Sequence, residues 1–175
     1  MEIAFWLLMI IGHLGFFDMM YYHTYKCRLH DYPECRAEVI THTFRHLIYA
    51  LQFFMIAHLR FYGWALLLLL SVYIIDASIA WIDVWLEKAS REKLGGLHKG
   101  EYLMHIILSV LVGAYLCSIA NAVYLDFSKL STIAIQPPNV PVFFRFYMTA
   151  MGCGAIFFFL YDGWKLLHTR VQQEK

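Results

Sequence analysis

The chain has 175 residues, of which 61% are hydrophobic, 18% are aromatic and only 15% are Asp, Glu, Lys or Arg. Soluble domains carry about 25% charged residues. This composition, with a mean hydropathy of +0.55, therefore excludes an ordinary soluble domain and indicates an integral membrane protein. The formal net charge of +1 gives no reason to expect a nucleic-acid partner.

Five segments are apolar enough to cross a bilayer, which takes ~20 mostly apolar residues each. In chain order they cover approximately residues 3–23, 37–60, 63–87, 101–124 and 141–166. Little chain is left over, so we expect one transmembrane domain over residues 1–175. Its predicted fold is all-α, an up-and-down bundle of five transmembrane helices. The first segment lacks a basic start and a small-residue cleavage site, so we expect it to be retained.

The connections between these segments contain residues that end helices. Pro33 cannot continue a preceding helix, and Gly95 and Gly96 break the chain before the fourth segment. Gly63 lies in a very short turn, so the second and third helices are predicted to be antiparallel neighbours. The long connection at 125–140 contains a Pro-Pro pair, and we expect it to be extended along the membrane surface.

Basic residues are concentrated on one side of the predicted bundle. Ten of the fourteen fall there: Lys26, Arg28, Arg36, Lys88, Arg91, Lys93, Lys99, Lys165, Arg170 and Lys175. An excess of Lys and Arg in short loops marks the cytoplasmic side. Five spans then place the N-terminus outside and the C-terminus in the cytoplasm. Cys27 and Cys35 fall on this side, where thiols stay reduced.

Six ionisable residues interrupt the apolar segments at similar depth near the cytoplasmic end. They are Asp18, Glu38, His42, Asp83, Glu101 and His105. At about 1.5 Å of rise per residue, most of them lie roughly 8–10 Å below the helix ends. His13, His46 and Asp76 lie deeper, and Glu87 is shallower. Ionisable residues inside membrane segments usually mark a functional site.

Helical spacing places most of these residues on shared faces. Residues four apart lie on one face, so Glu38, His42 and His46 form one stripe. Glu101 and His105 form a second stripe, and a third contains Asp76, Asp83 and Glu87. The order Asp, then Glu-x-x-x-His, occurs twice along the chain, which suggests two copies of one helical hairpin.

Burying so many charges requires compensation. A charged group at the centre of a spanning helix costs ~2.5–3.5 kcal/mol on insertion scales. Only Arg45 and Arg145 are plausible basic partners inside the predicted spans, so basic partners are too few. Two divalent cations would balance four carboxylates. Histidine with oxygen ligands suits iron above all, with zinc and manganese as alternatives.

The arrangement resembles that of the ferritin-like di-metal carboxylate proteins. In that family two helices each give one carboxylate and two others each give Glu-x-x-His. The matching residues here are Asp18, Asp83, Glu38 with His42, and Glu101 with His105. The resemblance implies a four-helix core with a dinuclear site. This chain departs from the family in its Glu-x-x-x-His spacing, in Asp for the lone Glu residues, and in its membrane-spanning helices.

The function favoured by these residues is a membrane oxidoreductase. We expect a dinuclear metal centre, di-iron or mixed iron and zinc, near the cytoplasmic face. Its depth suits a lipid-soluble substrate, a quinone or an oxygen species. The bilayer is the expected partner, and a homo-oligomer is compatible with the sequence.

Three alternatives remain open from the sequence. Intramembrane acid and histidine chains also serve metal or proton transport or storage. A zinc-dependent lipid hydrolase would use a zinc-bound water as nucleophile. A b-type haem protein would use paired histidines such as His42 and His105. Asp162 on the fifth segment either pairs with Lys165 or joins the site, and His58 is expected at the membrane interface.

Overall fold

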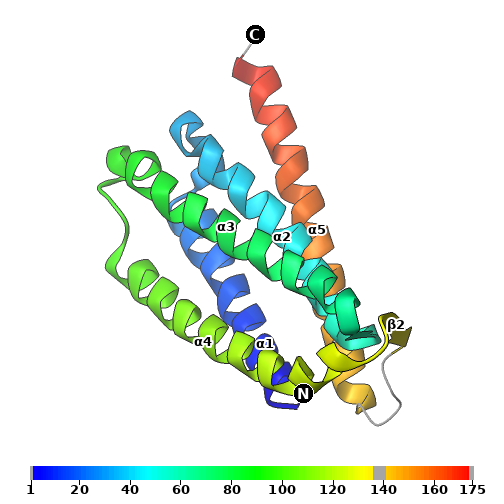
Figure 1. Cartoon of the computed structure of the whole chain (residues 1–175). Coiled ribbons are helices and arrows are strands. Elements are labelled where there is room, and N and C mark those ends of the chain that lie inside the picture. The colour runs from blue at the N-terminus through cyan, green and yellow to red at the C-terminus, as the bar shows by residue number, and fades with distance from the viewer. Residues whose placement is uncertain (1, 136–140, 174–175) are drawn as a thin grey trace.

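The computed structural model describes residues 2–135 and 141–173 of the chain. Five long helices run up and down in this part, as the apolar segments predicted (Figure 1). They are α1 (Glu2–Phe17), α2 (Arg36–His58), α3 (Leu66–Ser90), α4 (Lys99–Val123) and α5 (Val142–Gln173). The start of α1 lies at one end of the bundle, and α5 runs out at the other.

Four of the helical segments are long and apolar enough to cross a membrane. They cover Glu2–Lys26, Gly63–Ser90, Lys99–Ser128 and Val142–His168. The remaining helix, α2, has a suitable length but carries Arg36, Glu38 and Arg45 together with three histidines. These polar side chains lower its hydropathy below that of a typical spanning helix.

The helices pack as two connected groups. The α2 helix lies against both α3 and α5, whereas α4 lies against α1 (Figure 1). The prediction that the second and third helices are neighbours is therefore confirmed. An apolar core that includes Phe5, Leu8, Ile56, Leu69 and Met148 holds the groups together.

A short antiparallel strand pair, which the sequence did not predict, closes the end where α1 begins. The β1 strand (Leu59–Tyr62) pairs with β2 (Thr132–Ile135). The predicted second span was therefore too long, because the helix ends at His58 and the chain becomes extended. Gly63 then turns the chain at a φ of +56°, a left-handed conformation that favours glycine.

The long connection is extended over β2, in agreement with the prediction, and is preceded by the 3-10 turn η6 (Tyr124–Ser128). Residues 136–140, which contain the Pro-Pro pair, lie outside the described part, as does Lys175. A second short turn, η4 (Gly63–Ala65), leads from β1 into α3. Arg60 on β1 forms an ion pair with Asp126 of η6 and ties the two connections together.

The opposite end contains short turns and one irregular helix. The segment η1 (Asp18–Lys26) continues α1 as a π-helix. The 3-10 turns η2 (Leu29–Asp31) and η3 (Pro33–Cys35) lead into α2, and η5 (Glu92–Leu94) leads towards α4. The ionisable residues of the membrane segments gather just below this end.

Candidate metal centre

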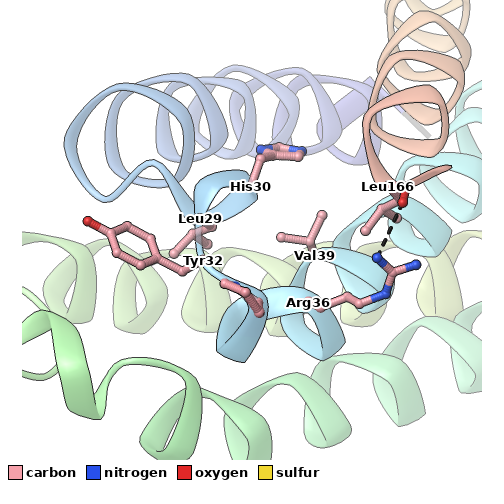
Figure 2. Close-up of a pocket in the computed structure, with 7 residues that line it drawn as sticks. Leu29, His30, Tyr32, Arg36, Val39 and Leu166 are labelled. Atoms are coloured by element: carbon pink, nitrogen blue, oxygen red, sulfur yellow. Dashed lines mark hydrogen bonds between the residues drawn. The ribbon is translucent and has the colours of Figure 1, made fainter. Parts of the chain in front are cut away.

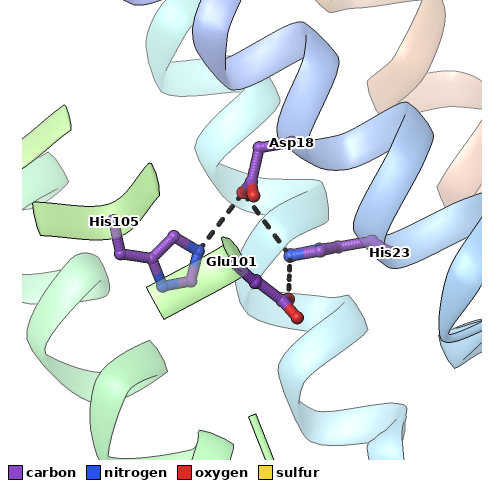
Figure 3. A group of neighbouring side chains, drawn as sticks. All are labelled: Asp18, His23, Glu101 and His105. Carbon is purple, nitrogen blue, oxygen red and sulfur yellow. Dashed lines mark hydrogen bonds and ion pairs between the residues drawn. The ribbon is translucent and has the colours of Figure 1, made fainter. Parts of the chain in front are cut away.

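Four of the six residues predicted to share one depth come together as two crossed pairs. His105 Nε2 lies 3.3 Å from Asp18 Oδ2 (Figure 3). His42 Nε2 likewise lies 3.3 Å from Asp83 Oδ1. Each pair joins an aspartate from one predicted hairpin to a histidine from the other. The two Glu-x-x-x-His stretches therefore face one another across the bundle.

The π-helix adds a residue that the sequence analysis missed, His23. On an α-helix, residues five apart differ in direction by about 140°, so Asp18 and His23 would diverge. A π-helix bonds each residue to the one five positions away, so residues at that spacing share a face. The side chains of Asp18 and His23 on η1 consequently both point into the layer (Figure 3). The missed signal was their five-residue spacing at the end of the first apolar segment.

Asp18, His23, Glu101 and His105 form a group whose ligand atoms all lie within 4.8 Å of one another. His23 Nε2 is 3.1 Å from Glu101 Oε1 and 3.6 Å from Asp18 Oδ2. Asp18, His23 and Glu101 are buried, and the His105 side chain is 23% exposed. Two imidazole nitrogens and two carboxylates at these distances fit the ligand set of iron, manganese or zinc.

A second group overlaps the first. It contains His23, Glu38 and His42, again within 4.8 Å of one another. The rings of His23 and His42 meet edge to face, with centroids 4.3 Å apart. His23 is therefore common to both groups.

Arg91 lies in the layer and adds a second basic partner beside Arg45. The sequence predicts Arg91 in the cytoplasmic loop, but its side chain is buried between two glutamates. Arg91 Nη2 lies 2.6 Å from Glu38 Oε1 and 2.6 Å from Glu101 Oε1. Ser90 Oγ also donates to Glu38. Burial disfavours the charged guanidinium, but the hydrogen bonds and charges of the two glutamates raise the pKa of Arg91.

Arg45 compensates the two aspartates of α3. Its Nε lies 3.6 Å from Asp76 Oδ1, and its Nη1 lies 3.5 Å from Asp83 Oδ2. Thr41 Oγ1 donates to Asp83 Oδ1 at 2.7 Å. Asp76 is therefore placed with Arg45, deeper in the bundle and outside both ligand groups.

Glu87 flanks the outer nitrogen of His105. Its Oε1 lies 3.1 Å from His105 Nδ1, while Nε2 of the same ring faces Asp18. A carboxylate beside the non-ligating nitrogen of a metal-bound histidine fixes the ring orientation and increases ligand basicity. Glu87 is thus positioned to support His105.

Two predicted site residues point elsewhere. His13 Nε2 contacts Tyr147 Oη at 2.5 Å, and its Nδ1 lies 2.8 Å from the Met9 carbonyl oxygen. His46 shares a stripe with His42, but its Nε2 lies 3.1 Å from Asp162 Oδ2 on α5. The stripe is broad enough for the two rings to reach different neighbouring helices.

The buried layer carries an excess of negative charge. Its six buried carboxylates are Asp18, Glu38, Asp76, Asp83, Glu87 and Glu101. The two guanidinium groups of Arg45 and Arg91 contact four of these carboxylates, which leaves four formal negative charges in the layer. Protonated histidines or metal ions would offset this excess.

Several polar atoms of the layer also lack hydrogen bonds. Among the described residues, Asp18 Oδ1, His23 Nε2 and His42 Nε2 are buried without a hydrogen-bond partner. The contact of His23 with Glu101 is short, but it does not have hydrogen-bond geometry. A buried polar atom without a partner costs about 1–3 kcal/mol. A cation between the imidazoles and the carboxylates would satisfy these atoms, so the residues present fit a metal ion.

No family model matches the chain, and neither a curated protein nor a solved structure matches it. The resemblance to the ferritin-like proteins therefore stays a prediction.

Proposed function

We propose that this chain is a membrane-embedded metal protein that works as an oxidoreductase on a lipid-soluble substrate, a quinone or an oxygen species. The observation that carries the proposal is the group of Asp18, His23, Glu101 and His105, with its ligand atoms within 4.8 Å of one another. Residues of the π-helix and of α4 supply this group, and a net negative layer surrounds it.

Iron is the metal that we favour. The group offers imidazole and carboxylate donors and no thiolate, a set that suits iron, manganese and zinc. When bound, iron would supply one-electron chemistry that the side chains lack. Glu87 would orient His105, and Arg91 would hold Glu101 in place.

A dinuclear centre remains part of the proposal, with a second ion near Glu38 and His42. The two groups share His23, so two ions would need a further ligand, and Asp83 beside His42 is the nearest carboxylate. Two ions would also need a carboxylate shared between them. Arg91 contacts both Glu38 and Glu101 at the place where such a carboxylate would be needed. Metal stoichiometry is the direct test: one ion per chain favours the first group alone, and two ions favour both.

We also propose that α2 completes a five-span topology with the N-terminus outside. Its charged residues face α3, α5 and Arg91 in the connection after α3, which supports burial inside the bundle and away from lipid. The centre would then lie close to the cytoplasmic face. A site inside the membrane is suited to substrates that partition into the bilayer.

Metal transport is a second candidate, favoured by one observation. Because His23 belongs to both ligand groups, an ion could pass from one to the other while it keeps this ligand. Uptake of ⁵⁵Fe or ⁶⁵Zn by vesicles that contain the protein tests this candidate. Flux that is lost in His23→Ala would favour transport over a resident centre.

The proposed function is tested by metal analysis and an optical spectrum of the protein purified in detergent without added metal. We expect stoichiometric iron, and an oxidised di-iron centre would add a near-ultraviolet charge-transfer band. A Soret band would indicate haem, and zinc alone would favour the hydrolase. Absence of any stoichiometric metal, also after reloading with iron or zinc, would refute the proposal.

A further inference from the structure

A second buried cluster lies between α2, α5 and η2, apart from the metal centre. Asp162 of α5 is 4% exposed and lies between two histidines. His30 Nε2 is 3.0 Å from Asp162 Oδ1, and His46 Nε2 is 3.1 Å from Asp162 Oδ2. Each carboxylate oxygen thus faces a different imidazole. The three side chains form one continuous hydrogen-bonded chain.

The outer end of this chain lies beside a small pocket near the cytoplasmic end of the bundle (Figure 2). The pocket is lined by Leu29, His30, Tyr32, Pro33, Arg36, Val39 and Leu166. Arg36 Nη1 donates to the carbonyl oxygen of Leu166 at 3.3 Å and closes one side. His30 is therefore the member of the cluster that lines this pocket, and its side chain is 12% exposed.

The inner end is His46, one helical turn from His42 on α2. Residues four apart on a helix are neighbours, with about 5–6 Å between their Cβ atoms. His42 belongs to the acid–histidine layer through Asp83. The cluster thus connects the cytoplasmic pocket with the edge of that layer.

We infer that His30, Asp162 and His46 form a proton relay between the cytoplasmic pocket and the acid–histidine layer. His30 takes a proton from water and passes the proton on its Nε2 to Asp162 Oδ1. Rotation of the protonated carboxyl group about its Cβ–Cγ bond then brings this proton beside His46, and Asp162 gives it to His46 Nε2. The carboxylate is ionised again once His46 has accepted the proton, and no electron is exchanged. Chains of Asp and His inside membrane segments commonly form such relays.

The charged groups around Asp162 are compatible with this role. His30 faces it from η2 and His46 from α2. Arg36 is engaged with the Leu166 carbonyl oxygen, and Lys165 lies over the Tyr161 ring. Asp162 forms ion pairs with His30 and His46, so its carboxylate is placed to accept a proton from either imidazole.

Only the destination of the protons, the metal centre, rests on the proposed function. A redox centre buried in a membrane needs protons when its charge changes, and the relay would deliver them from the cytoplasmic side. The transfer through Asp162 is a property of the three residues and is measurable without any metal.

The test is the exchange of the His46 imidazole N–H with water, followed by ¹⁵N NMR on the full chain in nanodiscs. Asp162→Asn keeps the size of the side chain but removes the proton acceptor. We expect this change to slow exchange at His46 on the order of 100-fold. His30→Gln, which alters the outer end only, should slow it in the same direction. Exchange at the exposed His58 serves as the internal reference.

Asp126→Asn is the matched control, since Asp126 is also buried but lies at the opposite end of the bundle. Exchange at His46 that is unchanged in Asp162→Asn or His30→Gln would overturn the relay. Equal slowing in Asp126→Asn would also overturn it, because it would indicate a general loss of mobility. Zinc stoichiometry measured on the same samples tests the metal centre separately. If exchange at His46 slows as expected in the variants but the protein binds no zinc, the centre is refuted and the relay is kept.

Discussion

Asp18 and His105 lie 3.3 Å apart although 87 residues separate them in the chain. The equivalent pair, Asp83 of the second hairpin and His42 of the first, repeats this distance. Each histidine is thus held by the aspartate of the other hairpin, and Arg91 joins the two glutamates between them. This crossed arrangement links the two halves of the predicted repeat through one charged layer.

Glu101→Ala is expected to abolish stoichiometric metal binding. The change removes one of the four ligands and leaves His23 Nε2 and Arg91 without their shared carboxylate. Metal content after reloading, measured by atomic emission, is the readout. His58→Ala is the control, because His58 lies at the exposed surface, where its Nε2 contacts Thr149 Oγ1. Equal metal loss in the two variants would contradict the assignment of the site.

His23→Ala and His46→Ala separate the two histidine clusters. His23 belongs to both ligand groups, so its removal should eliminate tight binding of iron or zinc. His46 contacts Asp162 instead, and its removal should leave the metal content unchanged. Both variants are compared by titration with zinc. A dependence of zinc binding on His46 would show that the stripe predicted from the sequence acts as one ligand set.

Glu87→Gln should weaken metal binding without removing it. Glu87 faces the outer nitrogen of His105, and loss of such a supporting carboxylate typically lowers metal affinity about 10–100-fold. The expected result is full stoichiometry at high zinc concentration with a raised Kd. Glu92→Gln, in the exposed η5 turn, provides a comparison. A complete loss of binding would instead make Glu87 a ligand.

Arg91→Met is expected to destabilise the fold strongly. It leaves Glu38 and Glu101 buried without their guanidinium partner, a change that typically costs about 3–5 kcal/mol. The free energy of unfolding in mixed detergent is the measurement. Arg28→Met, which breaks an exposed ion pair with Asp31, should have no measurable effect.

Metal should partly restore the stability of Arg91→Met. A divalent cation bound near Glu101 would replace part of the lost positive charge, and ligands that bind only the folded state stabilise it. The expected outcome is a larger zinc-induced increase in Tm for the variant than for the parent chain. A chelator should reverse this increase. The same zinc response in both proteins would argue against an ion beside these glutamates.

Cys27 and Cys35 should react slowly with alkylating reagents at neutral pH. Burial raises the pKa of both thiols, and the nearby Arg91 guanidinium only partly opposes this effect. The folded state therefore disfavours the thiolates. The protonated thiols stabilise the folded state at pH values below the ordinary thiol pKa, and this stabilisation is lost as the pH rises through the folded-state pKa. Iodoacetamide rates from pH 7 to 10 for single-cysteine variants, folded and in denaturant, should show a folded curve displaced to higher pH.

The sequence predicted the helices well because their signal is local. Long apolar segments specify spanning helices, and Gly63 or Pro33 marks where they end. The shared layer of Glu38 and Glu101 also followed from local information, since the rise per residue of a helix is fixed. Both glutamates contact Arg91 in this layer. The strand pair of β1 and β2 was missed because pairing between residues 59 and 135 is a long-range contact.

The composition, the helical segments and a shared layer of acids and histidines were thus determined by the sequence alone. Only the tertiary structure decided which of these side chains meet. The π-helix turned His23 towards Asp18, the chain after α3 placed Arg91 between two glutamates, and α5 drew His46 towards Asp162. Local spacing fixes the depth and direction of a side chain on its own helix, whereas its partner depends on how the helices pack.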